Sequence, residues 1–194
     1  MPIPAETKPT YTYADYLSWP DDERWELIHG KPFNMTPAPK PQHQRIVTRL
    51  AAQFVNILKG NPCEPFVAPF DVRLPSTEDA DKQTNDTVVQ PDISVVCDPD
   101  KIDDLGCLGP PDLIVEVLSE KTGSRDESCK LKLYEEQDVR EYWLVNPWDQ
   151  TVRIYNLNAD AKYDFPRFFT KLEIADSHAI QGLKVDLNDV FPEM

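Results

Sequence analysis

The sequence predicts an α/β (α+β) domain in which a central mixed β-sheet is flanked by helices. Two segments carry apolar residues at helical spacing, and they alternate with short aliphatic runs that are typical of strands. The second helical segment lies between two such runs, an order that favours a right-handed crossover. Proline contributes 19 of the 194 residues, about twice its usual share of roughly 5%, which argues against a mainly helical bundle.

The N-terminal part is expected to form a short helix and then a hairpin. Residues 12–18 begin with Thr12, and Asp15 stands three residues later, as in the capping box of a helix start. Residues 24–33 alternate in polarity around Gly30, a pattern that is typical of a β-hairpin.

The middle of the chain predicts one long helix followed by three strands. Apolar residues recur at helical spacing over 42–59, and Gly60 begins the expected stop signal. Strands are expected at 65–74, 87–97 and 112–119, where short apolar runs stand between turn-forming residues.

The last third of the chain predicts a second helix and further strands. The helix is expected over 125–137. Strands at 142–145 and 151–157 follow it, joined by a turn at 146–149. The apolar residues from Phe168 onward predict additional strands at the C-terminal end.

The composition restricts the classes of function. Lys and Arg number 20 and Asp and Glu number 34, which gives a formal net charge of −14. A chain with this charge does not attract nucleic acid or anionic lipid by its overall field, so a plain DNA-binding module is disfavoured. No apolar run reaches the roughly 18 residues of a membrane span, and the N-terminus has no apolar signal-peptide core. A cytoplasmic protein with no membrane partner is therefore expected.

The four cysteines, Cys63, Cys97, Cys107 and Cys129, are interpreted as free thiols. None of them belongs to a CxxC pair, and the chain is not a small secreted scaffold. For the same reason, a cysteine-rich zinc site is not expected.

Glu116 is the most informative residue, because its neighbours in the run 113–118 are all aliphatic. A run this apolar indicates a strand that is covered on both faces, and alternation places Glu116 on the face of Ile114 and Leu118. A lone carboxylate there is costly unless it is protonated, paired or bound to a metal ion. A functional carboxylate and an ion pair with Arg or Lys are the two interpretations.

Asp92 follows Pro91 inside a second apolar run, 88–96. Because proline cannot donate to the sheet ladder, this strand is expected to be an edge strand, to be bulged, or to leave a loop here. The carboxylate is then available at a local irregularity, and an ordinary turn aspartate is the alternative. Two carboxylates from neighbouring strands would form a hard-oxygen site suited to Mg²⁺ or Mn²⁺.

Lys130 is the candidate cation of this site. Asp126, Lys130 and Tyr134 are spaced by four residues and so share one helix face, and the neighbouring Leu133 suggests that this face turns towards the core. In that arrangement the Lys130 ammonium would lie near an attacking water or a scissile phosphate. The alternative is a surface ion pair between Asp126 and Lys130, worth a few tenths of a kcal/mol.

Several short motifs occur in order along roughly residues 10–160. They are Trp25-Glu26-Leu27-Ile28-x-Gly30, His43, Pro91-Asp92-Ile93, Pro111-Asp112-Leu113-Ile114-Val115-Glu116-Val117-Leu118-Ser119, Asp126-x3-Lys130-x3-Tyr134 and Glu141-Tyr142-Trp143-Leu144-Val145. In this order they resemble the Uma-two family of bacterial restriction-endonuclease-like proteins, placed in the PD-(D/E)XK nuclease superfamily. The resemblance implies a restriction-endonuclease-like fold with a core at about 24–157. The length of the chain predicts a single domain over 1–194, and the order of elements predicts extra β-strands at both ends.

The resemblance also implies an activity and its residues. It implies an endonuclease that hydrolyses DNA phosphodiester bonds with Mg²⁺, or with Mn²⁺ in its place. Asp92 and Glu116 match the metal-binding acids, and the main-chain carbonyl of Val117 would be a further ligand. Glu26 matches an acid near the metal ion and His43 a residue of the first long helix, so both are candidate catalytic residues. For His43, an exposed histidine at a helix start is the alternative.

One position departs from the superfamily pattern. A lysine is expected two residues after Glu116, and the residue there is Leu118. The resemblance implies that Lys130, on the next helix, takes the role from a different backbone position. If Lys130 cannot reach the site, the chain would be an inactive relic of the fold that binds DNA or protein.

The sequence is also compatible with a third function and with a dimer. A Mg²⁺-dependent phosphohydrolase acting on a smaller substrate is a third possible function. Cleavage of both DNA strands by one active site per chain would favour a homodimer.

Overall fold

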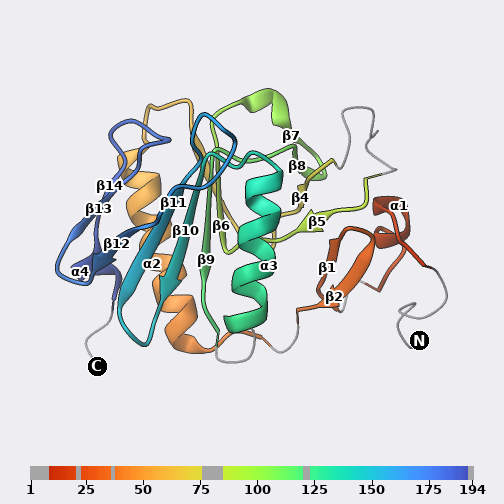
Figure 1. Ribbon diagram of the computed structural model, residues 1–194, viewed down its shortest axis with the longest axis horizontal. Helices are drawn as coiled ribbons and strands as arrows, with labels where there is room; N and C mark the ends of the chain where they lie inside the picture. The colour runs from red at the N-terminus through yellow and green to blue at the C-terminus, as the bar shows by residue number, and fades with distance from the viewer. Residues whose placement is uncertain (1–8, 21–22, 36–37, 76–84, 120–122, 192–194) are drawn as a thin grey trace.

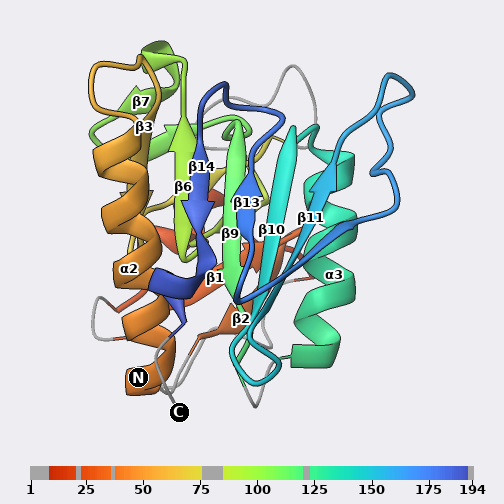
Figure 2. The same cartoon turned by 90° about the vertical axis from the view of Figure 1, so that its left-hand side faces the viewer.

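A six-stranded mixed sheet with a long helix on each face forms the centre of the computed structural model (Figures 1 and 2). The strand order is β12-β11-β10-β9-β6-β3, in which β9 and β10 run parallel and the other neighbours are antiparallel. These strands are β3 (Glu64–Val67), β6 (Ile93–Val96), β9 (Leu113–Val117), β10 (Glu141–Asn146), β11 (Thr151–Asn156) and β12 (Arg167–Thr170). The structure describes residues 9–20, 23–35, 38–75, 85–119 and 123–191. For residues 123–127 it describes the backbone only.

The two long helices cover opposite faces of this sheet because β9 alternates between them. Helix α2 (Pro41–Ile57) packs through Leu50 and Phe54 on the face that carries Val115. Helix α3 (Gly123–Glu136) is the crossover between β9 and β10, and its Leu133 packs on the face of Ile114. The expected fold class, a mixed sheet flanked by helices, is confirmed.

A second six-stranded sheet lies beside the first, in the order β2-β1-β5-β4-β8-β7. It contains the expected hairpin, whose turn residues His29 and Gly30 both have positive φ (48° and 70°), and the short helix α1 lies close to this hairpin (Figure 1). The elements of this part are α1 (Tyr13–Tyr16), β1 (Trp25–Ile28), β2 (Lys31–Asn34), β4 (Val72–Arg73), β5 (Val88–Val89), the 3₁₀ helix η1 (Pro99–Lys101), β7 (Ile102–Asp103) and β8 (Gly106–Leu108).

Two of the predicted strands are wrong as single elements, because each is divided between the two sheets. Residues 65–74 form β3 in the central sheet and β4 in the second sheet. Residues 87–97 form β5 and β6, and the interruption lies at Gln90-Pro91-Asp92. Since Pro91 has no N–H to donate, the ladder stops there and the chain passes from one sheet to the other.

The C-terminal part adds a small hairpin and a helix to the α2 side of the molecule. The hairpin consists of β13 (Ile174–Asp176) and β14 (Lys184–Asp186), and the helix α4 (Leu187–Val190) follows directly. Side chains of both elements belong to the same apolar cluster as α2. None of the helices in the described ranges is long and apolar enough to cross a membrane.

The interpretation of all four cysteines as free thiols is wrong for two of them. Cys63 and Cys97 form a disulfide with an S–S distance of 2.00 Å. Strands β3 and β6 pair antiparallel with Glu64 opposite Val96, so the residues just beyond that pair stand opposite each other. Cys107 and Cys129 are free, the first buried and the second exposed.

We therefore expect two reactive thiols per chain rather than four. Thiol titration of the denatured protein without reductant should count Cys107 and Cys129 only, and a strong reductant should raise the count to four. A count of four before reduction would contradict the disulfide.

Candidate active site

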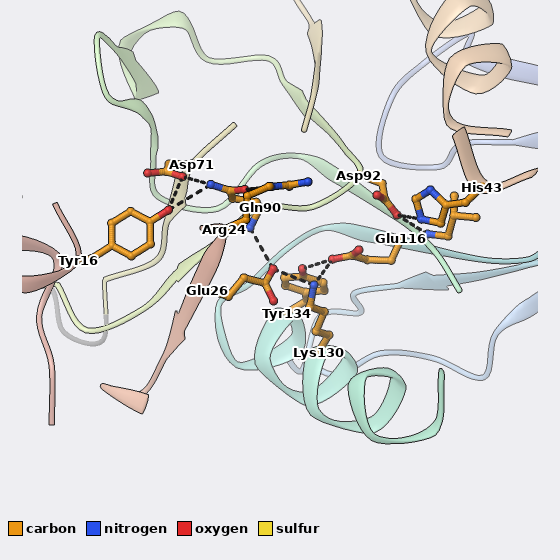
Figure 3. Close-up of polar contacts among 11 residues, drawn as sticks. Tyr16, Arg24, Glu26, His43, Asp71, Gln90, Asp92, Glu116, Lys130 and Tyr134 are labelled. Carbon is orange, nitrogen blue, oxygen red and sulfur yellow. Dashed lines mark hydrogen bonds and ion pairs between the residues drawn. The ribbon is translucent and has the colours of Figure 1, made fainter. Parts of the chain in front are cut away.

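Glu116 and Glu26 hold the ammonium of Lys130 between them (Figure 3). Lys130 Nζ lies 2.8 Å from Glu116 Oε1 and 2.9 Å from Glu26 Oε1. The three side chains come from β9, β1 and α3, and Lys130 is only 8% exposed. Because Lys130 is buried, the alternative interpretation of this residue as a surface lysine is wrong. The side chain of Asp126, its partner in that interpretation, lies outside the described residues. The ion pair predicted as the alternative for Glu116 exists, and its cation is the predicted site lysine.

Two further donors fix the positions of these carboxylates. Tyr134 OH donates to Glu116 Oε1 over 2.7 Å, one helical turn after Lys130. The backbone N–H of Gln90 donates to Glu26 Oε1 over 3.1 Å. Glu26 thus connects the second sheet to the crossover helix of the central sheet.

The charges in this cluster shift the pKa values of its members. Burial raises the pKa of Glu116 to about 7, and the negative charges of Asp92 and Glu26 add to the rise, while Lys130 opposes it. Burial acts to lower the pKa of Lys130, but Glu116 and Glu26 outweigh it and raise that pKa well above its usual value. Lys130 is therefore charged, and its charge balances part of the surrounding negative charge.

Asp92 forms a second cluster with His43 and the backbone of Val117. Asp92 Oδ2 lies 3.1 Å from His43 Nε2 and accepts the Val117 N–H over 2.8 Å. Burial acts to lower the pKa of His43, but Asp92, Glu116 and the backbone of Val117 together raise it. The exposed alternative for His43 is wrong, since the residue is only 9% exposed.

The two clusters meet on β9, where Glu116 and Val117 are consecutive residues. Figure 3 shows the Glu116 carboxylate between the Lys130 ammonium and the side of the site that holds Asp92. Each cluster contains one of the two predicted metal-binding acids. The structure thus brings Asp92, Glu116, Lys130, Glu26 and His43 together, from five different elements or connections.

The donor set of this site fits a hard divalent cation. Asp92 and Glu116 each use one carboxylate oxygen in the contacts above, and no described residue hydrogen-bonds the other oxygen, Oδ1 or Oε2. Mg²⁺ is typically bound by one or two carboxylates, with waters and substrate phosphate in the remaining positions. Within the described part of the chain, no group of three or more His, Cys, Asp or Glu side chains is arranged to hold a metal ion. The two carboxylates would therefore be the side-chain ligands that this part of the chain offers to an ion here.

Sequence reasoning did not assign Tyr134, Gln90 or Arg24 to the site. Tyr134 shares the helix face of Lys130, so its spacing was a usable signal. Gln90 and Arg24 gave none, because their contact, Arg24 Nε to Gln90 Oε1 over 3.1 Å, joins residues that are 66 positions apart.

The fold is shared with a solved structure. That structure, from Anabaena variabilis ATCC 29413, is described as a "putative nuclease belonging to DUF820". It superimposes with a TM-score of 0.73, covers 93% of this chain and 97% of its own chain, and is 19% identical in sequence. By its fold, the chain is thus an α+β domain with the architecture of that protein.

The family follows from the sequence itself. A family model for Uma2, described as "Putative restriction endonuclease", matches residues 13–188. The chain belongs to the Uma2 family, which confirms the resemblance of its motifs. An uncharacterized protein of Synechocystis sp. is 28% identical over 163 residues, covering 82% of this chain and 81% of the relative.

Proposed function

We propose that the protein is an endonuclease that hydrolyses DNA phosphodiester bonds with Mg²⁺ or Mn²⁺. The observation that carries this proposal is the placement of Lys130 against Glu116, within one residue of the backbone that binds Asp92. Two acids and a lysine at one point are the groups that metal-assisted phosphodiester hydrolysis uses. Membership of the Uma2 family supports the same reaction class.

Each residue has a definite role in this proposal. Asp92, Glu116 and the Val117 carbonyl would hold the ion, and a bound ion would lower the pKa of a water and stabilise charge on the phosphoryl group. Lys130 supplies a fixed positive charge beside the reacting phosphate. Glu26 holds the Lys130 ammonium in place, and His43 orients the Asp92 carboxylate.

Lys130 matters to this proposal because Leu118, which stands two residues after Glu116, carries no charge. Lys130 reaches Glu116 from α3 over 2.8 Å, so the change of backbone position does not remove the ammonium from the site. The bonds of Lys130 to two carboxylates also favour a second candidate, an inactive fold in which these ion pairs are only structural.

Plasmid cleavage separates these candidates. We expect the purified protein to nick or linearise supercoiled DNA with Mg²⁺ or Mn²⁺ and to stop in EDTA. Turnover of nucleotides or phosphate esters with DNA untouched would indicate a small-substrate phosphohydrolase. DNA binding without turnover of any of these would indicate the inactive relic.

We also propose a homodimer, because two sites are needed to cut both strands together.

Metal binding should be measurable without activity. If the site binds Mg²⁺ in the native state only, a concentration 100 times the Kd stabilises the fold by about 2.7 kcal/mol. For a chain of this size that corresponds to a rise in Tm of roughly 5–10 °C. A titration of Tm with Mg²⁺ and Mn²⁺ tests this, with Asp92→Asn as the control that should not respond. A Tm that is constant for the unsubstituted protein would favour the purely structural ion pair.

A further inference from the structure

A pocket of about 230 Å³ lies beside Asp92, between α2, the end of β3 and the residue that precedes β1. Arg24 and Asp92 both line it, so a cation and a proposed metal-binding acid share this pocket. Val47, Ala51 and Ala68 add apolar surface to its lining. The pocket therefore combines a positive group with apolar carbon, next to the proposed site of hydrolysis.

Arg24 is held in one orientation by the side chain of Gln90. Its Nε and Nη2 donate to Gln90 Oε1 over 3.1 and 2.9 Å. Gln90 Nε2 in turn donates to Tyr16 OH over 3.1 Å and to Asp71 Oδ1 over 2.8 Å, and Tyr16 OH donates to Asp71 Oδ1 (Figure 3). This chain of bonds determines which end of the Gln90 amide faces Arg24.

The charge of Arg24 has no ionic partner among the described side chains. Arg73, Arg140 and Arg167 are each paired with an aspartate, whereas Arg24 contacts the neutral oxygen of an amide. A guanidinium has five N–H donors, and Gln90 accepts from two of them. The terminal edge formed by Nη1 and Nη2 keeps a pair of donors in the fork geometry that binds phosphate or carboxylate with two hydrogen bonds.

We propose that this pocket is the subsite for the sugar–phosphate backbone of the substrate. Arg24 binds the non-bridging oxygens of a phosphate next to the scissile bond, and the apolar wall contacts the deoxyribose. Gln90 is a positioning residue for Arg24, and α1 contributes Tyr16 to the same positioning. The substrate class rests on the proposed function, but the binding step does not require cleavage. In this way a chain with net charge −14 would place a second cation, Arg24, beside a polyanion, in addition to the Lys130 ammonium.

The test measures binding and cleavage separately. Anisotropy of a fluorescent DNA oligonucleotide in Ca²⁺ without Mg²⁺ gives the Kd in the absence of turnover. For Arg24→Met we expect the Kd to rise by about 10–100-fold, the usual cost of a hydrogen-bonded charge contact. The slope of log Kd against log salt should fall by about one. Arg45→Met is the matched control, because Arg45 is an exposed arginine of α2 that does not line the pocket.

The outcomes distinguish the proposed backbone subsite from the proposed nuclease activity. If the unsubstituted protein cleaves DNA and Arg24→Met binds and cleaves equally well, the subsite is wrong and the nuclease stands. If the unsubstituted protein binds DNA without cleaving it and Arg24→Met loses that binding, the subsite stands and the nuclease is wrong. Equal losses in Arg24→Met and Arg45→Met, or no DNA binding by the unsubstituted protein, overturn the subsite. Arg24→Lys, which keeps the charge without the fork, should bind with intermediate affinity, and its use avoids dependence on how well Arg24→Met folds.

Discussion

Glu116→Gln should reduce DNA cleavage by about 10³-fold, the equivalent of about 4 kcal/mol of transition-state stabilisation. The substitution removes one of the two carboxylate charges that would hold the ion and keeps the volume of the side chain. The amide oxygen of glutamine can still accept the bonds from Lys130 and Tyr134, which now end on Glu116 Oε1. We therefore expect the loss in activity without a comparable loss in stability.

A matched substitution on α3 provides the control for Glu116→Gln. Glu135 is a carboxylate whose contacts are with Lys162 and the backbone N–H of Tyr163, outside the site. Glu135→Gln should cleave plasmid DNA at close to the unsubstituted rate. Initial rates at saturating Mg²⁺ and at limiting Mg²⁺ distinguish loss of the ion from loss of chemistry. Cleavage by Glu116→Gln at the unsubstituted rate would contradict the assignment of Glu116 as a metal ligand.

Local patterns in the sequence predicted the elements that carry the site. The helical periodicity of residues 42–59 predicted α2, and the apolar run around Glu116 predicted β9. Glu116 stood out because a charge inside an aliphatic strand needs a partner. Lys130 could be selected because its helix face also carries Leu133, which is buried.

Contacts between distant parts of the chain could not be predicted in this way. Glu26 and Lys130 are 104 positions apart, and no local pattern signals that β1 approaches α3. The division of residues 65–74 between two sheets has the same origin, because an apolar run indicates a strand without indicating its neighbours. The positions of Arg24 and Gln90 depend on the second sheet, so their role emerged only from the tertiary structure.

The second sheet positions residues of the candidate active site. It carries Glu26 on β1, and Gln90 follows β5 in the same sheet. Glu26 bonds to the Lys130 ammonium, and Gln90 bonds to both Glu26 and Arg24. The second sheet and the residue that follows β5 therefore supply Glu26 and Gln90 to the site, whereas Glu116 comes from β9 of the central sheet and Asp92 directly precedes β6.

Lys130→Met should destabilise the fold by about 3–5 kcal/mol, because it leaves two buried carboxylates without their cation. Glu26 and Glu116 would then repel each other in a region from which water is largely excluded. A buried carboxyl with a raised pKa, such as Glu116, stabilises the fold most when it is protonated. Without the ammonium the pKa of Glu116 rises further, so at acid pH Glu116 is protonated in both proteins, and from about pH 7 only the unsubstituted protein ionises it freely. The deficit of Lys130→Met should therefore be smallest at acid pH and grow as the pH rises above about 7. Urea unfolding at several pH values measures it.

A double-mutant cycle makes the origin of this deficit testable. Glu116→Gln should stabilise the Lys130→Met protein, because it removes one of the uncompensated charges, although it should leave the parent protein unchanged or less stable. Lys132→Met is the control on the same helix, since Lys132 is exposed and pairs with Glu136 at 3.4 Å, and its cost should be at most about 0.5 kcal/mol. If Lys130→Met cost no more than Lys132→Met, the ammonium would not be compensating buried charge, and the electrostatic role given to Lys130 would be wrong.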